Sequence, residues 1–169
     1  MLLYTEDKFP LYKIENGKVV ETSTEERENF HKEKLEELLE INKEIKINES
    51  KLLLSQYLES HPLISNCHNN IEAEYTVTTE KQSLIVSNYL TYTVAKTAGL
   101  DAKLTWNSSG QECEEWTEEE YTTLILQISE YVKPLVSLQQ SYEVEIKACT
   151  NQDELNNIII NYEKGGSNE

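Results

Sequence analysis

Short alternations of apolar and charged residues flank Asn16-Gly17 near the start of the chain. Residues 11–15 (LYKIE) and 18–22 (KVVET) lie on either side of this dipeptide, which tolerates the positive φ angles of a two-residue type I′ turn. The pattern predicts a β-hairpin. Because an isolated two-stranded hairpin is only marginally stable in water, we expect it to pack against another part of the chain or against a partner.

A long helix is predicted after the hairpin. Ser23 with Glu26, or Thr22 with Glu25, forms a capping box at its N-terminus. The helix is expected to end near residue 60, because Pro62 disfavours helix at the residue before it.

The heptad pattern in this helix is incomplete. Leu38, Ile45 and Leu52 are seven residues apart, but the alternate seam positions are Asn42 and Glu49. We therefore expect a one-sided amphipathic helix and not a sustained coiled coil. The other apolar residues of the expected stripe are Leu35, Leu39, Ile41, Leu53 and Tyr57.

Two further strands and a turn are predicted after residue 70. Apolar residues alternate with polar ones in IEAEYTVT (71–78) and again in LDAKLTW (100–106), and this spacing is typical of strands with one buried face. The segment NSSG (107–110) has the composition of a turn.

Three capping boxes mark helix starts in the same half of the chain. They are Thr79 with Gln82, Thr117 with Glu120, and Thr150 with Asp153. The first of these helices is expected to end near Ala98, where Gly99 supplies a left-handed C-terminal cap. The last helix is expected to be short.

The helix that begins after Thr117 contains a proline. Apolar residues keep helical spacing on both sides of Pro134. Proline has no backbone N–H and crowds the carbonyl four residues earlier, at Glu130. The pattern therefore predicts a kink at Pro134, or two helices that meet there at an angle.

Together these elements predict an α+β fold in two parts. Residues 1–62 are expected to form a docking arm made of the hairpin and the amphipathic helix. Residues 71–162 are expected to form a small α+β domain in which the Pro-kinked or Pro-broken helix wraps a small sheet, and residues 163–169 a disordered tail.

The formal net charge of −16 narrows the choice of partners. A chain this acidic repels phosphates, so direct binding to nucleic acid or to an anionic membrane is not expected. The charge can serve solubility, or it can present an acidic surface to a basic partner and so mimic nucleic acid.

No run of the sequence approaches the roughly 20 apolar residues of a membrane span. The first residues are acidic where a signal peptide is basic, so we expect the protein to remain in the cytoplasm.

Motifs of catalysis and of metal binding are missing from the sequence. None of the five glycines falls in a phosphate-binding arrangement, and no serine lies in a Gly-x-Ser-x-Gly elbow. Three widely spaced cysteines indicate reduced thiols, and His61, Cys67 and His68 lack the paired spacing of zinc ligands. We predict a non-enzymatic protein without metal or cofactor, with His31, His61 and His68 on the surface.

Aromatic and amide side chains are the candidate interaction residues. Ten tyrosines against two phenylalanines favour contact surfaces, because tyrosine combines a large apolar ring with a polar tip, although tyrosines at the margin of a core give the same composition. Adjacent glutamines offer adaptable hydrogen bonds. The candidates are Tyr12, Tyr89, Tyr92, Trp106, Trp116, Tyr121, Gln139 and Gln140.

Residues 75–158 resemble an uncharacterised domain found at the C-terminal end of phage and prophage tail proteins. The segments that carry the resemblance are TVTTEKQSLIVSNYL, LTWNSSGQECEEWTEEEYTTLILQI, YVKPLVSLQQ and IKACTNQDELNNI. The last is similar to an ending common among proteins associated with tail fibres or their assembly, and FPLYKIENGKVVET is similar in style to head segments of such phage proteins. The resemblance implies no site residues.

The resemblance and the absence of catalytic motifs predict a phage tail-associated protein. It would be a minor structural component or an accessory factor in tail-fibre or baseplate assembly that binds a tail or fibre protein, with a homo-oligomer as an open alternative to a monomer. It would reside in the cytoplasm of the bacterial host during assembly, or in the virion tail. The alternative is an acidic, phage-encoded inhibitor that mimics nucleic acid and binds a basic host complex.

Overall fold

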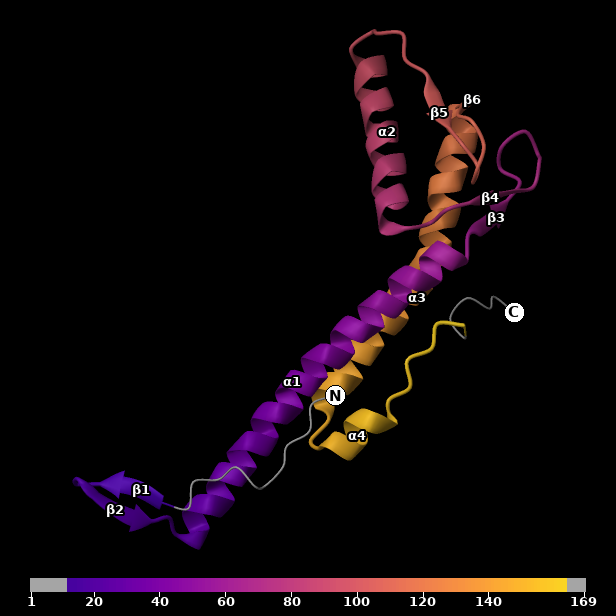
Figure 1. Ribbon diagram of the computed structural model, residues 1–169. Coiled ribbons are helices and arrows are strands. Elements are labelled where there is room, and N and C mark those ends of the chain that lie inside the picture. The colour runs from indigo at the N-terminus through magenta and orange to yellow at the C-terminus, as the bar shows by residue number, and fades with distance from the viewer. Residues whose placement is uncertain (1–11, 164–169) are drawn as a thin grey trace. The chain divides into compact units, whose positions relative to one another are not determined.

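The computed structural model describes residues 12–163, and it has an α+β fold (Figure 1). Residues 1–11 and 164–169, which include Leu11 of the expected hairpin and nearly all of the expected tail, lie outside the described part. In chain order the elements are β1 (Tyr12–Glu15), β2 (Lys18–Glu21), α1 (Thr24–Ser60), β3 (Leu63–Ser65), β4 (Ala73–Tyr75), α2 (Thr79–Thr97), β5 (Leu104–Trp106), β6 (Glu114–Trp116), α3 (Glu118–Ala148) and α4 (Gln152–Asn157).

The described residues fall into two compact units that are interleaved in sequence. The first contains residues 12–49 and 143–159, and the second contains residues 50–142 and 160–163. The divisions therefore lie within α1 and within α3. The expected boundary between the arm (1–62) and the domain (71–162) falls inside the second unit, where residues 63–65 form β3 and residues 66–72 connect β3 to β4.

The predicted hairpin is confirmed in the first unit. Strands β1 and β2 pair antiparallel, with Glu15 opposite Lys18. Asn16 and Gly17 have φ angles of 50° and 75°, as a type I′ turn requires. Lys13 forms an ion pair with Glu26 in the first turn of α1, so the hairpin is tied to the helix that follows it.

The start of α1 follows the predicted capping box. The backbone N–H of Ser23 donates to Glu26 Oε2 at 2.8 Å, and the backbone N–H of Glu26 donates to Ser23 Oγ at 3.2 Å. The helix continues to Ser60, as expected from Pro62. Each end is thus set by local chemistry that the sequence displays.

Burial along α1 differs from the expected apolar stripe. Leu35, Ile41 and Ile45 are exposed, whereas Asn42 and Lys43 are buried. The amide of Asn42 donates to Gln152 Oε1 of α4 at 2.8 Å, and this bond satisfies a group that would otherwise be costly to bury. Polar contacts of this kind place residues 42–43 inside the first unit in spite of their polarity.

The core of the second unit gathers around α3. Tyr121, Leu124 and Leu135 of this helix are fully buried, and Ile85 of α2 packs in the same cluster. Buried residues from strands and loops complete it: Tyr75, Val77, Leu104, Trp116 and Tyr162, together with Leu58 of α1. Their burial supplies the main stabilising term for this unit.

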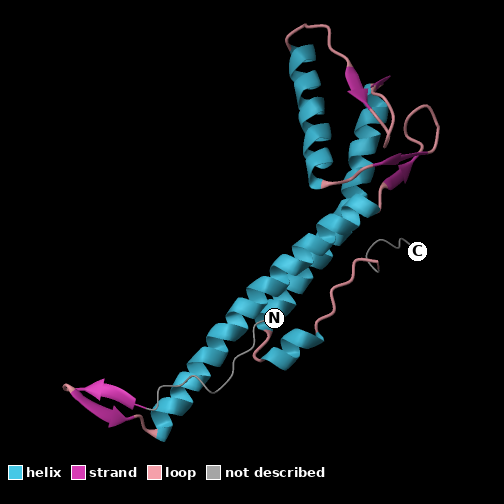
Figure 2. Cartoon of the chain, viewed as in Figure 1, coloured by secondary structure: helices cyan, strands magenta, loops and turns pink. Residues whose placement is uncertain are grey.

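The strands of the second unit form two separate pairs and not one small sheet. Strand β3 pairs antiparallel with β4, and β5 pairs antiparallel with β6 (Figure 2). The sequence predicted segments around β4 and β5 but missed β3 and β6. Each strand has only three residues, which is too short for an alternating pattern to be visible.

The first residues of α2 and α4 are capped one position away from the predicted boxes. For α2, Thr78 and not Thr79 accepts from the backbone N–H of Lys81. For α4, Asn151 and not Thr150 accepts from the backbone N–H of Glu154 at 2.9 Å. In both places two capping residues are adjacent, and the backbone conformation selects one of them.

The other predicted helix termini are confirmed. Gly99, with φ 72°, ends α2, and the bonds from Gly99 N to Lys96 O and from Leu100 N to Ala95 O form a Schellman motif. Thr117 and Glu120 form the reciprocal capping box of α3.

Pro134 lies within α3, which continues unbroken to Ala148, so the alternative of two separate helices is wrong.

Candidate functional site

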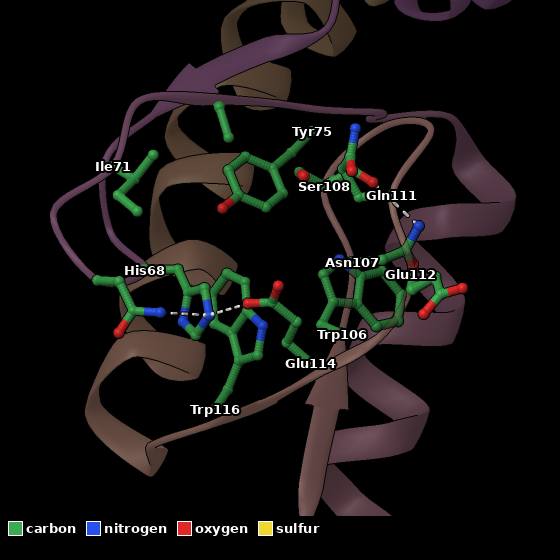
Figure 3. A pocket seen from close by; sticks show the side chains of 12 residues that line it. His68, Ile71, Tyr75, Trp106, Asn107, Ser108, Gln111, Glu112, Glu114 and Trp116 are labelled. Atoms are coloured by element: carbon green, nitrogen blue, oxygen red, sulfur yellow. Dashed lines mark hydrogen bonds and ion pairs between the residues drawn. The ribbon is translucent and has the colours of Figure 1, made fainter.

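A pocket of 130 Å³ opens where the β3–β4 loop meets the β5–β6 pair (Figure 3). Tyr75, Trp106 and Trp116 form aromatic walls, and Glu112 and Glu114 add carboxylates. In Figure 3 Trp106 and Trp116 lie on opposite sides, with Glu114 between them. The remaining lining residues are His68, Asn69, Ile71, Ala73, Asn107, Ser108 and Gln111.

His68 is an integral part of this pocket, contrary to its expected position on the surface. Its side chain is only 13% exposed, and its ring stacks on that of Trp116. Nε2 lies 3.1 Å from Glu114 Oε2, and Nδ1 lies 3.5 Å from Glu120 Oε2. These contacts are made by residues far apart in sequence, so no local pattern indicated them.

Glu120 joins the pocket loop to the first turn of α3. Its Oε1 accepts from the backbone N–H of Asn69 at 3.0 Å, and its Oε2 accepts from the backbone N–H of Thr117 at 3.0 Å. These two bonds stabilise the charged form and lower the pKa of Glu120 to about 2. The same carboxylate therefore caps the helix and fixes the loop.

The nucleophile-type side chains beside the pocket are held in their neutral forms. Burial raises the pKa of the Tyr75 hydroxyl to about 12, with a further contribution from Cys67. Burial also raises the pKa of the Cys67 thiol. An activated nucleophile needs the opposite shift, because the deprotonated form is the reactive one.

Trp116 has a buried donor that finds no partner among residues 12–163. The residue is 5% exposed, and its Nε1 makes no hydrogen bond within the described part of the chain. Buried indole N–H groups normally find an acceptor, because an unmet one retains its full desolvation cost. Among the described residues this indole N–H is therefore left without an acceptor.

Across residues 12–163 there is no group of three or more His, Cys, Asp or Glu side chains placed to hold an ion. None of the helices in this range is both long and apolar enough to cross a membrane.

Five of the predicted interaction residues form one aromatic cluster. Tyr121 is its centre: its ring lies 6.2 Å from that of Tyr89, 6.1 Å from Trp106 and 6.0 Å from Trp116. Tyr92 extends the cluster from Tyr89. Tyr121 and Trp116 are buried, whereas Tyr89, Tyr92 and Trp106 are partly exposed. Of the five, Trp106 and Trp116 line the pocket.

The other three predicted interaction residues lie elsewhere. Tyr12 is 60% exposed on the hairpin of the first unit. Gln139 is buried and donates to Ser50 Oγ at 3.2 Å, whereas Gln140 is exposed and lines a second hollow, described next. The adjacent glutamines thus have different environments, because neighbouring helix positions point about 100° apart.

The second hollow is an apolar groove of 530 Å³ between α2 and α3. We name it the α2–α3 groove. Its apolar lining consists of Ile85, Val86, Ile125, Ile128, Val132 and Val136, and its polar lining of Gln82, Ser129, Lys133, Ser137 and Gln140. Val86 is 54% exposed, and Val136 is 37% exposed. Apolar side chains left accessible in a groove of this size are typical of a binding surface.

The outward face of α2 continues this apolar surface. Val86, Leu90 and Val94 recur at intervals of four and are exposed. Four hydroxyl groups on the helix donate to the carbonyl four residues earlier and are thereby partly satisfied: those of Ser83, Thr91, Thr93 and Thr97. Glu80, Lys81 and Lys96 are the charged residues of α2, so its central turns carry no charge although the chain is strongly acidic.

Comparisons with family models, with curated proteins and with solved structures find no match to this chain.

Proposed function

We propose that this protein is a non-enzymatic component or accessory factor of phage tail or tail-fibre assembly, and that it binds its partner in the α2–α3 groove. The observation that carries the proposal is the groove itself, with accessible apolar side chains on both of its walls. Burial of such side chains against a partner is the dominant favourable contribution to most protein association.

The chemistry of the groove favours an α-helix as the bound segment. Both walls are helices, whose backbone groups are already hydrogen-bonded, so the groove offers no free strand edge. A bound segment must therefore satisfy its own backbone, as a helix does. We propose a partner helix with an apolar stripe toward the groove and a neutral or basic outer face, because this chain has a net charge of −16.

The segments that resemble phage tail proteins contain the groove residues. Gln82, Ile85 and Val86 fall within TVTTEKQSLIVSNYL, and the residues from α3 fall within the two following segments, with Ser129 between them. The proposed contact surface and the proposed family therefore rest on the same stretches of chain. The raised pKa values of Tyr75 and Cys67 agree with a role in binding and not in catalysis.

The proposal is tested by capture from lysate of phage-producing cells at low and at high salt, with bound proteins identified by mass spectrometry. We expect an identified tail or fibre subunit that stays bound at high salt, because apolar contacts are not screened. V86E and V136E should abolish capture, since each buries a charge in the complex. L126E is the matched control, because Leu126 is 64% exposed on α3 and does not line the groove.

Two results would overturn the proposal. Equal capture by V86E, V136E and L126E would exclude the groove as the binding site. Capture of a basic host nucleoprotein that is released at high salt would instead support the acidic inhibitor, because screening at physiological ionic strength acts over about 8 Å.

A further inference from the structure

The aromatic pocket that Glu114 helps to line is chemically unlike the α2–α3 groove, and its hydrogen-bonding groups restrict what can occupy it. Trp116 Nε1 can only donate, and it is buried without a partner among the described residues. An occupant must therefore bring an acceptor to this atom if the cost of burying the indole N–H is to be recovered.

The carboxylates of the pocket impose the opposite requirement on a ligand. Glu112 and Glu114 line the pocket and, when ionised, can only accept. The side chain of Glu114 remains 66% exposed while it contacts His68, so it retains accessible lone pairs. A carboxylate or phosphate ligand would satisfy Trp116 but would be repelled by these two groups.

A simple cation fits no better. An ammonium or guanidinium group suits Glu112 and Glu114, but it carries only donors and would leave the Trp116 N–H unmet. A hydroxyl group both donates and accepts. Neighbouring hydroxyls on one molecule can accept from Trp116 and donate to Glu114 at the same time, with no charge required.

The walls and the size of the pocket indicate a ring. Trp106 offers a partly exposed apolar surface, whereas Tyr75 and Trp116 line the pocket with only 2% and 5% of their surfaces exposed. Asn107 and Ser108 add polar groups to the lining. A volume of 130 Å³ greatly exceeds the roughly 10–15 Å³ that one water molecule needs. The space therefore suits a small molecule with apolar C–H surface and several hydroxyl groups.

We propose that this pocket binds a neutral polyhydroxylated ring, that is, one unit of a saccharide. Trp116 Nε1 donates to an oxygen of the sugar, Glu114 accepts from a sugar hydroxyl, and the ring lies between the aromatic walls. The saccharide proposal does not depend on the proposed partner binding in the α2–α3 groove, so either proposal can hold if the other fails.

The two tryptophans of the chain provide the readout, because both line this pocket. Intrinsic fluorescence of the intact protein is titrated with glucose, galactose, mannose and N-acetylglucosamine. We expect a saturable change with at least one sugar at a dissociation constant on the order of millimolar, typical of a weak single-unit contact. Ethylammonium and acetate probe cationic and anionic occupants, and we expect no saturable change with them. Acetamide is neutral and both donates and accepts but has no ring, so we expect it to bind more weakly than the sugar.

Two variants separate the proposed contacts from general damage to the fold. W116F removes the N–H and keeps an aromatic ring, so affinity should fall about tenfold or more, with Trp106 as the remaining reporter. E114Q removes the charge but keeps an acceptor oxygen, so sugar affinity should change only a few-fold. V86E in the groove should leave sugar binding unchanged. Far-UV circular dichroism checks that each variant is folded.

Three results would overturn the saccharide proposal. A signal that does not saturate with any of the four sugars would exclude binding. Saturable binding of ethylammonium that E114Q abolishes would identify the pocket as a cation site. Unchanged sugar affinity in folded W116F would show that the indole N–H makes no contact with the ligand.

Discussion

The imidazole of His68 lies flat against the indole of Trp116, with ring centroids 4.2 Å apart and planes inclined by 6°. His68 belongs to the loop between β3 and β4, and Trp116 ends β6, so the stack joins two strand pairs that share no backbone ladder. Glu114 and Glu120 flank the imidazole. The floor of the pocket is thus held by side chains and not by a sheet.

We expect H68A to lower the free energy of unfolding by about 1–3 kcal/mol, because it removes both a ring contact and a hydrogen bond to a carboxylate. Urea unfolding followed by circular dichroism measures the change. H61A is the control: His61 also stacks, on Tyr57, but its side chain is 41% exposed. An equal loss in both variants would show that burial of His68 has no special importance.

The adjacent glutamines of α3 provide a second comparison. Q139A should lower the free energy of unfolding by about 1–3 kcal/mol, because Gln139 is buried and hydrogen-bonded to Ser50. Q140A should change it by less than about 0.5 kcal/mol, because Gln140 is exposed. Midpoints of thermal unfolding for the two variants check this order. Similar losses would contradict the assignment of Gln139 alone to the interior.

Substitution of the proline in α3 should stabilise the protein. Pro134 lies far from either end of the helix, where it removes the backbone hydrogen bond to the carbonyl of Glu130. Its ring is exposed, so little burial offsets this loss. P134A should raise the free energy of unfolding by about 1–3 kcal/mol. Urea titration measures it. A decrease would mean that a bend imposed by the ring is needed for packing on both sides of residue 134.

Glu120 should make the free energy of unfolding depend on pH. Its pKa is lowered from 4.5 to about 2 in the folded protein, so its contribution is complete above pH 4.5 and is lost as the pH falls toward 2. In E120Q this contribution is absent at every pH. The difference in unfolding free energy between the two proteins should therefore be largest above pH 4.5 and shrink toward pH 2. A difference that is constant over this range would contradict the lowered pKa.

Much of the secondary structure could be predicted, because its determinants are local. Asn16-Gly17 specifies a turn through its own backbone preferences, and Thr117 with Glu120 starts a helix through bonds that span three residues. Where two capping residues are adjacent, as at Thr78 and Thr79, the sequence predicted the start of the helix only to within one residue. The three-residue strands β3 and β6 escaped prediction, because they are defined by their pairing partners.

The pocket could be predicted only in part. Trp106 and Trp116 were among the candidate residues on grounds of composition, but His68 was expected on the surface. Its neighbours, Glu114 and Glu120, are 46 and 52 positions away, and they look like members of an ordinary acidic run. The sequence around Glu120 predicted its role in the capping box, but it did not indicate that the same carboxylate accepts a hydrogen bond from the backbone N–H of Asn69.

The sequence by itself determined the α+β class, the hairpin, the ends of the long helices and the acidic charge, since each depends on near neighbours or on composition. Only the tertiary structure decided that Asn42, Lys43 and Gln139 are buried, that Leu90 and Val94 are exposed, and that His68 stacks on Trp116. Burial depends on which distant segments cover a side chain. A polar group can enter the interior when such a segment supplies its hydrogen bond, and an apolar one stays at the surface when none covers it.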